Sequence, residues 1–349
     1  MTEQIVPTAE TLPRPAPAVR EASLTTCLGI ARRLFDRVRV AVRGRDEVIE
    51  LVLIALLSDG HVLLEDFPGS GKTTLAKALG EALLDDRAQE TRGVIEAFRR
   101  IQFTPDLLPS DVTGTSVFEP RTGTFSFRPG PIFAHVVLAD EINRTSPKVQ
   151  AAMLEAMAEK QVTVDNVTRP LDELFFVIAT QNPLDLAGTF PLPVAQLDRF
   201  LFKIRMTHIE REAELEVLRS IAQRRETPSA PRVSRSEILL ARRVIEEQVH
   251  VHTLIHESLV DIARALREDR RVIQGVSTRS LVLALPALRA RAMIYGRDYV
   301  ATEDLEAILP RVFGHRLELS AGSAEADAVV ADALRPAVER LARASMARG

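Results

Sequence analysis

Short apolar runs alternate with stretches of helical spacing over the first 206 residues of the chain. Five runs are almost continuously apolar and suit short strands: residues 61–65, 100–103, 135–140, 174–180 and 200–205. Continuous apolarity is typical of strands in a parallel sheet, because both faces of such a sheet are covered. Between the runs, residues 73–84 and 148–160 carry apolar side chains at helical spacing. This alternation predicts an α/β fold, a parallel sheet with flanking helices joined by right-handed crossovers.

The remainder of the chain, from about residue 207, has helical spacing and no strand signal. Six helical stretches are predicted there: residues 209–224, 234–250, 253–267, 278–295, 302–313 and 324–344. The change of pattern predicts three parts. A flexible proline-rich tail occupies residues 1–22, an α/β core follows over 23–206, and a smaller all-helical domain with a C-terminal helical extension covers 207–349.

Composition limits the class of protein that this chain can be, but it indicates no binding or catalytic site. The chain has 349 residues and a formal net charge of −3, so its overall charge does not favour nucleic acid or an acidic membrane surface. Its single cysteine, Cys27, fits a reducing compartment. No apolar run reaches the roughly 20 residues of a membrane span, and the tail lacks the apolar segment of a signal peptide. These features predict a cytoplasmic chain with no membrane insertion.

The first apolar run is followed at once by a loop with closely spaced glycines and then by a helical stretch. The loop and first turn read Asp66-Phe67-Pro68-Gly69-Ser70-Gly71-Lys72-Thr73-Thr74. This matches the phosphate-binding pattern G-x-x-x-x-G-K-[ST], except that Asp66 replaces the first glycine. Glycines let successive backbone N–H groups surround one anion, and the helix start adds its positive dipole end.

We therefore expect residues 68–74 to hold the phosphates of ATP. Lys72 is expected to pair with the β- and γ-phosphates, and the Thr73 hydroxyl to bind Mg²⁺. The alternative is an ordinary glycine turn, which the order strand, loop, helix disfavours.

Polar side chains also follow two later strands. Asp140 and Glu141 come directly after a buried run, and Asn182 follows the next run. Ligands of open α/β sheets gather at the carboxyl ends of the strands. Asp140 is thus expected to bind Mg²⁺ and Glu141 to polarise the attacking water. Asn182 either hydrogen-bonds that water or the γ-phosphate, or is a turn residue before proline, and spacing does not decide between the two.

Several longer segments resemble the MoxR family of AAA+ ATPases, over about residues 38–316. They include Phe103-Thr104-Pro105-Asp106-Leu107-Leu108-Pro109-Ser110-Asp111, Asp140-Glu141-Ile142-Asn143-Arg144, Leu154-Glu155-Ala156-Met157, Ala179-Thr180-Gln181-Asn182-Pro183, Gln196-Leu197-Asp198-Arg199-Phe200 and Gly275-Val276-Ser277-Thr278-Arg279-Ser280. The resemblance implies an AAA+ core, a helical lid and ATP hydrolysis. It also implies a homo-oligomeric ring of six copies, with chaperone-like work on protein clients, among them von Willebrand A domain proteins.

The resemblance assigns roles to three further residues. Asn182 matches the sensor-1 position, Arg199 the arginine finger that reaches the nucleotide of the adjacent subunit, and Arg279 the sensor-2 arginine at the start of a lid helix. Arg279 is expected to close over the nucleotide from the second domain. Without the resemblance, both arginines would count as ordinary surface residues.

The family also carries two inserted hairpins that are thought to face the ring pore or a client. Here they are predicted at residues 117–127 and 161–170, where Phe118 and Phe125 either contact a client or pack on their own hairpin. Two rival functions stay open. A nucleic-acid motor would need a basic channel, and the hairpins and their flanks balance three arginines against three carboxylates. A nucleotide-gated scaffold would bind ATP with little turnover.

Overall fold

The computed structural model describes residues 22–65, 70–87, 95–182, 188–222, 230–322 and 325–346. Its centre is a five-stranded sheet in which every neighbouring pair is parallel. The strands are β1 (Val62–Glu65), β3 (Glu96–Gln102), β6 (Ala134–Asp140), β9 (Phe176–Gln181) and β10 (Phe202–Arg205), in the order β10-β1-β9-β6-β3. All five predicted strands are confirmed, and so is the parallel sheet.

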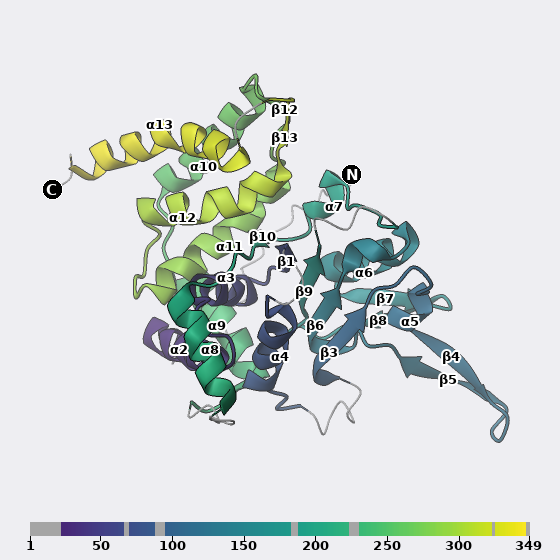
Figure 1. Cartoon of the computed structure of the whole chain (residues 1–349). Coiled ribbons are helices and arrows are strands. Elements are labelled where there is room, and N and C mark those ends of the chain that lie inside the picture. Colours follow the sequence, from purple (N-terminus) through teal and green to yellow (C-terminus); the bar gives the residue numbers. More distant parts are fainter. Residues whose placement is uncertain are drawn as a thin grey trace, which may run out of the picture.

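Alternate residues of the three central strands β1, β9 and β6 face two separate hydrophobic clusters, as the pleat of a strand requires. In β1, Val62 and Leu64 join the larger cluster, whereas Leu63 joins the smaller one. The larger cluster includes α2 (Leu24–Ala41), α3 (Asp46–Leu57) and α4 (Lys72–Ala82), and the smaller one includes α6 (Pro147–Glu159). The sheet therefore has helices on both faces (Figure 1).

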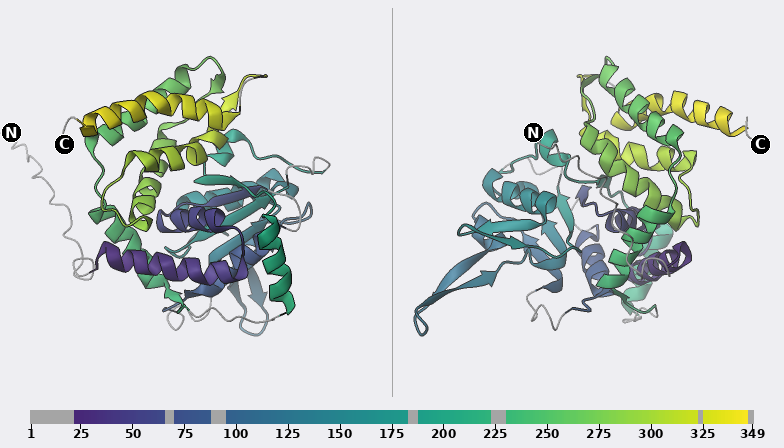
Figure 2. Two further views of the ribbon diagram at one scale, coloured as in Figure 1. Left: turned by 60° about the vertical axis from the view of Figure 1, so that its left-hand side comes forward. Right: turned by 180° about the vertical axis from the view of Figure 1, so that it is seen from behind.

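Six longer helices follow the sheet and form the helical part of the molecule (Figure 2). They are α8 (Arg211–Ala222), α9 (Arg235–Gln248), α10 (Thr253–Glu268), α11 (Thr278–Ile294), α12 (Thr302–Phe313) and α13 (Ala326–Met346). The prediction of a helical domain agrees with this, but the prediction that it is all-helical is wrong, because short strands also occur in it. β11 (Val233–Ser234) pairs with β2 (Leu83–Leu84) of the core, and β12 (Val272–Gln274) pairs with β13 (Glu318–Leu319).

Both predicted hairpins are present. β4 (Gly114–Glu119) pairs with β5 (Thr124–Pro129), and β7 (Gln161–Val164) pairs with β8 (Val167–Pro170). Asp165 and Asn166 have φ angles of 51° and 61°, the left-handed conformation that a two-residue hairpin turn needs at both positions. Figure 1 shows the β4–β5 hairpin projecting far from the sheet.

The strand order predicts that a ligand binds at the carboxyl end of β1. The chain leaves β1 for the edge strand β3, comes back through β6 and β9, and places β10 on the other side of β1. Ligands of such sheets bind at the carboxyl ends of the strands where the order changes direction. The predicted phosphate loop begins there.

The sequence predicted a flexible tail at the start of the chain and no segment that crosses a membrane. Of the predicted flexible tail, residues 1–21 lie outside the described residues. Within the ranges given above, no helix has both the length and the apolarity needed to cross a bilayer.

Candidate functional site

The start of α4 is shaped to receive an anion. Gly71 has a φ angle of 92°, in the left-handed region that favours glycine, and the helix begins at Lys72 with no side chain capping it. A Cβ atom placed on Gly71 would meet no atom of the other described residues within 4 Å, apart from its chain neighbours and its own helix. The hydroxyl oxygen of Ser70 is buried and has no hydrogen-bond partner among the described residues. A helix start whose N-cap residue has no side chain, next to a buried hydroxyl without a described partner, suits the phosphates of a nucleotide.

The predicted phosphate-binding residues are only partly described. Asp66, Phe67, Pro68 and Gly69 lie outside the described residues. Lys72, Thr73 and Thr74 form the first turn of α4, where Thr73 is exposed. The Thr73 hydroxyl is therefore accessible to a ligand that docks at the helix start.

One buried hydroxyl links the two carboxylate residues predicted from the sequence. The Thr180 hydroxyl donates to Asp140 Oδ1 over 2.6 Å and accepts the backbone N–H of Glu141 over 2.9 Å. Glu141 has a φ angle of 59°, a conformation that is uncommon for a residue other than glycine. Thr180 fixes both the Asp140 carboxylate and the backbone turn that aims the Glu141 side chain. The sequence signal was a single polar residue at the end of the β9 apolar run, and its role was not predicted.

Two side chains of β3 hold the outer oxygens of this pair. Arg100 donates to Asp140 Oδ2 from Nε over 3.1 Å and from an Nη over 2.6 Å. The Gln102 amide donates to Glu141 Oε2 over 2.9 Å, and Arg144 lies 3.3 Å from the same oxygen. Gln102 pairs with Asp140 in the β3–β6 register, which explains why both β3 side chains reach the site. Neither residue was predicted, because the run that contains them indicated only a strand.

The end of β9 extends this polar region toward β1. Asn182 follows β9 directly, and β9 pairs with both β6 and β1, so Asn182 lies at the same edge of the sheet as Glu141. The neighbouring Gln181 amide donates to Glu65 over 2.8 Å, and Lys203 lies 2.9 Å from the same carboxylate oxygen. Burial alone would raise the pKa of Glu65, but its bonds to Lys203 and Gln181 hold that pKa below the ordinary value.

Arg199 lies at the opposite end of β1. It sits between α7 (Val194–Leu197) and β10, and the N–H of Leu201 donates to the carbonyl of His61, the residue before β1. The four residues of β1 therefore separate Arg199 from the phosphate loop, roughly 13 Å of extended chain. One Nη of Arg199 lies 3.4 Å from the Ala195 carbonyl, and its Nε is buried without an acceptor among the described residues.

Arg279 accompanies Arg199 at that end of the sheet. It is the second residue of α11 and is exposed. The hydroxyls of Ser277 and Ser280, on either side of it, donate to the carboxylate of Asp198 over 3.5 and 3.2 Å. The predicted site residues thus form two groups, the phosphate loop with Asp140, Glu141 and Asn182, and the pair of arginines. The sensor-2 role of Arg279 stays a prediction.

Comparisons with known proteins agree with the fold. Residues 61–202 match the model of the ATPase family associated with various cellular activities (AAA), and residues 264–336 match an AAA lid domain. Chaperone MoxR1 of Mycobacterium tuberculosis is 37% identical over 300 residues, which cover 83% of this chain and 76% of that protein. Protein MoxR of Methylorubrum extorquens is 30% identical over 338 residues, 86% of this chain and 90% of that protein.

This chain belongs to the MoxR family of AAA+ ATPases. A solved structure shares its fold. The crystal structure of a candidate ATPase from Cytophaga hutchinsonii superposes with a TM-score of 0.78 at 35% identity, covering 89% of this chain and 96% of that one. The predicted AAA+ core with a C-terminal lid is confirmed.

Proposed function

We propose that this MoxR-family chain binds ATP with Mg²⁺ and hydrolyses the nucleotide. Residues 68–74 hold the phosphates. Among them, Lys72 and the backbone N–H groups at the start of α4 make the main contacts. Thr73 and Asp140 hold Mg²⁺, which when bound neutralises part of the phosphate charge. The glycine N-cap of α4 and the Ser70 hydroxyl, which has no partner among the described residues, support this assignment.

In this proposal the chain's own residues activate water and stabilise charge. Glu141 accepts the proton of the attacking water, and Asn182 orients that water or the γ-phosphate. The bond from Thr180 to Asp140 is the observation that carries the proposal. It joins the ends of β6 and β9 into one rigid carboxylate pair at the strand ends where the phosphate loop begins.

Arg199 and Arg279 act on the nucleotide of a neighbouring copy. Both lie near the beginnings of the strands, away from the phosphate loop of their own chain, and the Arg199 Nε lacks an acceptor among the described residues. An arginine supplied by another subunit accelerates phosphoryl transfer by about 10³–10⁵-fold. Catalysis therefore requires a homo-oligomer, and we propose the six-copy ring of the family.

The biological work that we propose is remodelling of protein clients in the cytoplasm, with von Willebrand A domain proteins as one client class. The exposed aromatic pair on the β4–β5 hairpin supports a client contact. Phe118 and Phe125 are 50% and 73% exposed, and their ring centroids lie 5.2 Å apart. Two large apolar rings on a projecting hairpin suit an apolar protein segment.

Nucleic acid suits the hairpins less well. The Arg169 guanidinium lies over the Phe127 ring, 3.7 Å from its centroid, so one of the three nearby arginines is already engaged. Addition of single- or double-stranded DNA is expected to leave the ATPase rate unchanged, and clear stimulation would favour the nucleic-acid motor instead.

The direct test is steady-state ATP hydrolysis with Mg²⁺ by the full chain and by two variants. Lys72→Ala should abolish nucleotide binding, whereas Glu141→Gln should bind ATP and hydrolyse it at least about 10²-fold more slowly. Pull-downs from the native host with ATP should then enrich client proteins on Glu141→Gln and not on Lys72→Ala. Undiminished hydrolysis by Lys72→Ala would refute the proposed site, and identical protein sets on both variants would refute nucleotide-gated remodelling.

A further inference from the structure

A buried arginine of the helical part holds the backbone on both sides of Arg199. Arg316, in the short helix η2 (Gly314–Arg316), is 2% exposed. One of its Nη atoms donates to the carbonyls of Asp198 and Phe200 over 3.0 and 2.7 Å. The other donates to the carbonyls of Leu201, over 3.3 Å, and Val312. The backbone at Arg199 is thus fixed from both neighbours by one rigid guanidinium.

Asp198 connects the same guanidinium to the start of α11. Its Oδ1 accepts Arg316 Nε over 2.7 Å and the Ser280 hydroxyl over 3.2 Å, while Oδ2 accepts the Ser277 hydroxyl. Ser277 is the N-cap of α11, so the carboxylate also lies beside the positive end of that helix. Asp198 therefore contacts residues on both sides of Arg279 and directly precedes Arg199.

The charges around Arg316 agree with this geometry. Burial lowers the pKa of the Arg316 guanidinium, and the positive charge of Arg279 lowers it further, whereas Asp198 opposes both effects. A buried cation in such a position depends on its carboxylate partner, because loss of the carboxylate would leave the buried positive charge uncompensated. The bond between Asp198 and Arg316 therefore compensates a buried positive charge at the contact between core and helical part.

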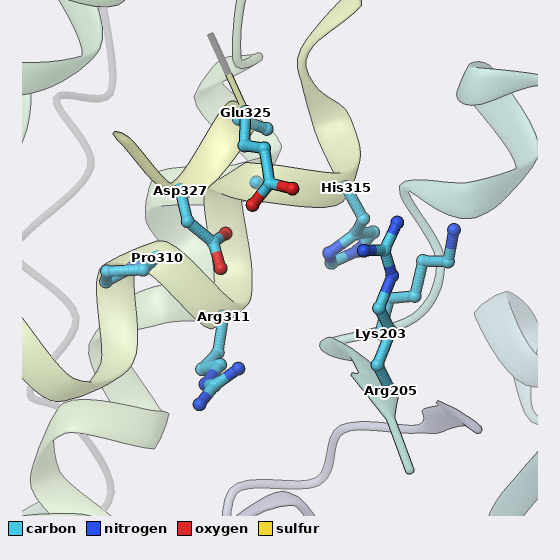
Figure 3. Close-up of a pocket in the computed structure, with 9 residues that line it drawn as sticks. Lys203, Arg205, Pro310, Arg311, His315, Glu325 and Asp327 are labelled. Atoms are coloured by element: carbon cyan, nitrogen blue, oxygen red, sulfur yellow. The ribbon is translucent and has the colours of Figure 1, made fainter. Parts of the chain in front are cut away.

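Packing next to these bonds is incomplete. A cavity of about 260 Å³ lies between β10 and the helical part, lined by Lys203 and Arg205 from β10 and by His315, Glu325 and Asp327 from the helical part (Figure 3). A cavity contributes no van der Waals contact across the interface. Arg316 directly follows His315, which lines this cavity, so its directional bonds act alongside the hydrophobic cluster that β10 and α12 share.

We propose that Asp198 and Arg316 form a clamp that positions Arg199 and Arg279 as one unit toward the nucleotide of a neighbouring copy. The clamp consists of Asp198 and Arg316 together with Ser277 and Ser280, whose hydroxyls bond to Asp198. Asp198 and Arg316 are positioning residues, since neither touches the nucleotide. Because each end of the clamp lies in a different part of the fold, a shift of the helical part moves both arginines together. This inference rests on the proposed hydrolysis and its arrangement between subunits.

The clamp is tested with Asp198→Asn, which keeps one acceptor for Arg316 and removes the charge. Ser277→Ala/Ser280→Ala is the milder variant, which cuts only the link to α11. We expect Asp198→Asn to lower kcat of the assembled protein by about 10²-fold, the loss that a displacement of about 1 Å can cause, with an unchanged Kd for ATP. We expect no further loss when Asp198→Asn is added to Arg199→Ala/Arg279→Ala. Additive losses would mean that Asp198 acts on stability and not on the two arginines.

Mixing two inactive proteins separates positioning from simple instability. Asp198→Asn keeps an intact phosphate loop, and Lys72→Ala keeps an intact clamp. Mixed assemblies should regain hydrolysis, because a Lys72→Ala subunit presents well-placed arginines to the nucleotide of its neighbour. The matched control, Lys72→Ala/Arg199→Ala, should give no recovery. Failure of the first mixture to recover would overturn the clamp.

Failure of the clamp and failure of the proposed function give different results. Absence of hydrolysis in the unmodified protein would refute the proposed function itself. Hydrolysis that falls with Arg199→Ala but not with Asp198→Asn or with Ser277→Ala/Ser280→Ala would refute only the clamp.

Discussion

The side-chain amide of Gln102 donates a hydrogen bond to the carboxylate of Glu141 over 2.9 Å. Gln102 ends β3, and Glu141 follows β6, so two neighbouring strands meet at the group that we assign as the base. The bond from Gln102 holds the Glu141 side chain in one position.

We expect Gln102→Met to raise the basal rate of ATP hydrolysis. A hydrogen bond to a charged group stabilises by about 1.5–3 kcal/mol, and about 1.4 kcal/mol corresponds to a tenfold change in rate. An increase of about tenfold in kcat is therefore the expected result in steady-state assays. The variant Gln102→Met/Glu141→Gln controls for effects that bypass the base. A fall in kcat would show that Gln102 aims Glu141 productively instead of restraining it.

Thr180 offers a second test of the same site, because it orients Asp140 and the backbone of Glu141. Thr180→Val removes the hydroxyl that joins Asp140 to the Glu141 backbone and leaves Asp140 Oδ1 without this donor. We expect kcat to fall by about 10²-fold, since small misplacements of catalytic groups carry such costs. Thr180→Ser keeps the hydroxyl and should stay within a few-fold of the unmodified rate. Equal losses in the two variants would indicate that the threonine methyl group matters and the hydroxyl does not.

His61 makes the stability of the fold depend on pH. Its ring is buried next to β1, where Nδ1 accepts the Val177 N–H over 3.1 Å and Nε2 lies 3.2 Å from the Met157 carbonyl. Burial lowers the pKa of His61 to about 4, against an ordinary value of about 6.5. The unfolded chain therefore binds a proton at a higher pH than the folded one. The stabilisation is complete above about pH 6.5 and is lost as the pH falls toward 4.

The expected loss in the free energy of unfolding is up to about 3 kcal/mol between pH 7 and pH 4 from this group alone. Denaturant unfolding at several pH values measures it. His61→Gln provides an amide in place of the ring and does not titrate, so its stability should fall less steeply over this interval. Parallel pH profiles for both proteins would exclude His61 as the source.

The β4–β5 hairpin should bind clients through its exposed rings. Phe118→Ser/Phe125→Ser removes both rings of the pair without touching the hydrophobic clusters of the core. We expect client recovery on a Glu141→Gln background to fall at least tenfold, with basal hydrolysis and melting temperature unchanged. Leu218→Ser is the matched control, because this apolar residue on α8 is 64% exposed and lies outside the hairpin. Undiminished recovery would place the client contact elsewhere.

The sequence predicted the parts of this protein that depend on local pattern. Continuous apolar runs identified five strands of a two-sided parallel sheet, and the spacing around Gly71 and Lys72 identified the helix start that suits phosphates. Both features are set within a few residues, because pleat and helix period are local properties of the backbone. The two hairpins were expected from the family resemblance. The apolar stretch of α3 was missed, since a helix buried on nearly every side shows little amphipathic periodicity.

Only the tertiary structure decided which distant side chains meet. Arg100 and Gln102 reach the carboxylate pair because of the β3–β6 register, and a one-residue slip would turn them to the other face. Arg316 reaches Asp198 across more than a hundred residues of sequence, and the two arginines share one end of the sheet. The contact between Arg316 and Asp198 follows from how the helical part docks on β10. That docking depends on shape and charge complementarity between surfaces far apart in the chain, which no local pattern records.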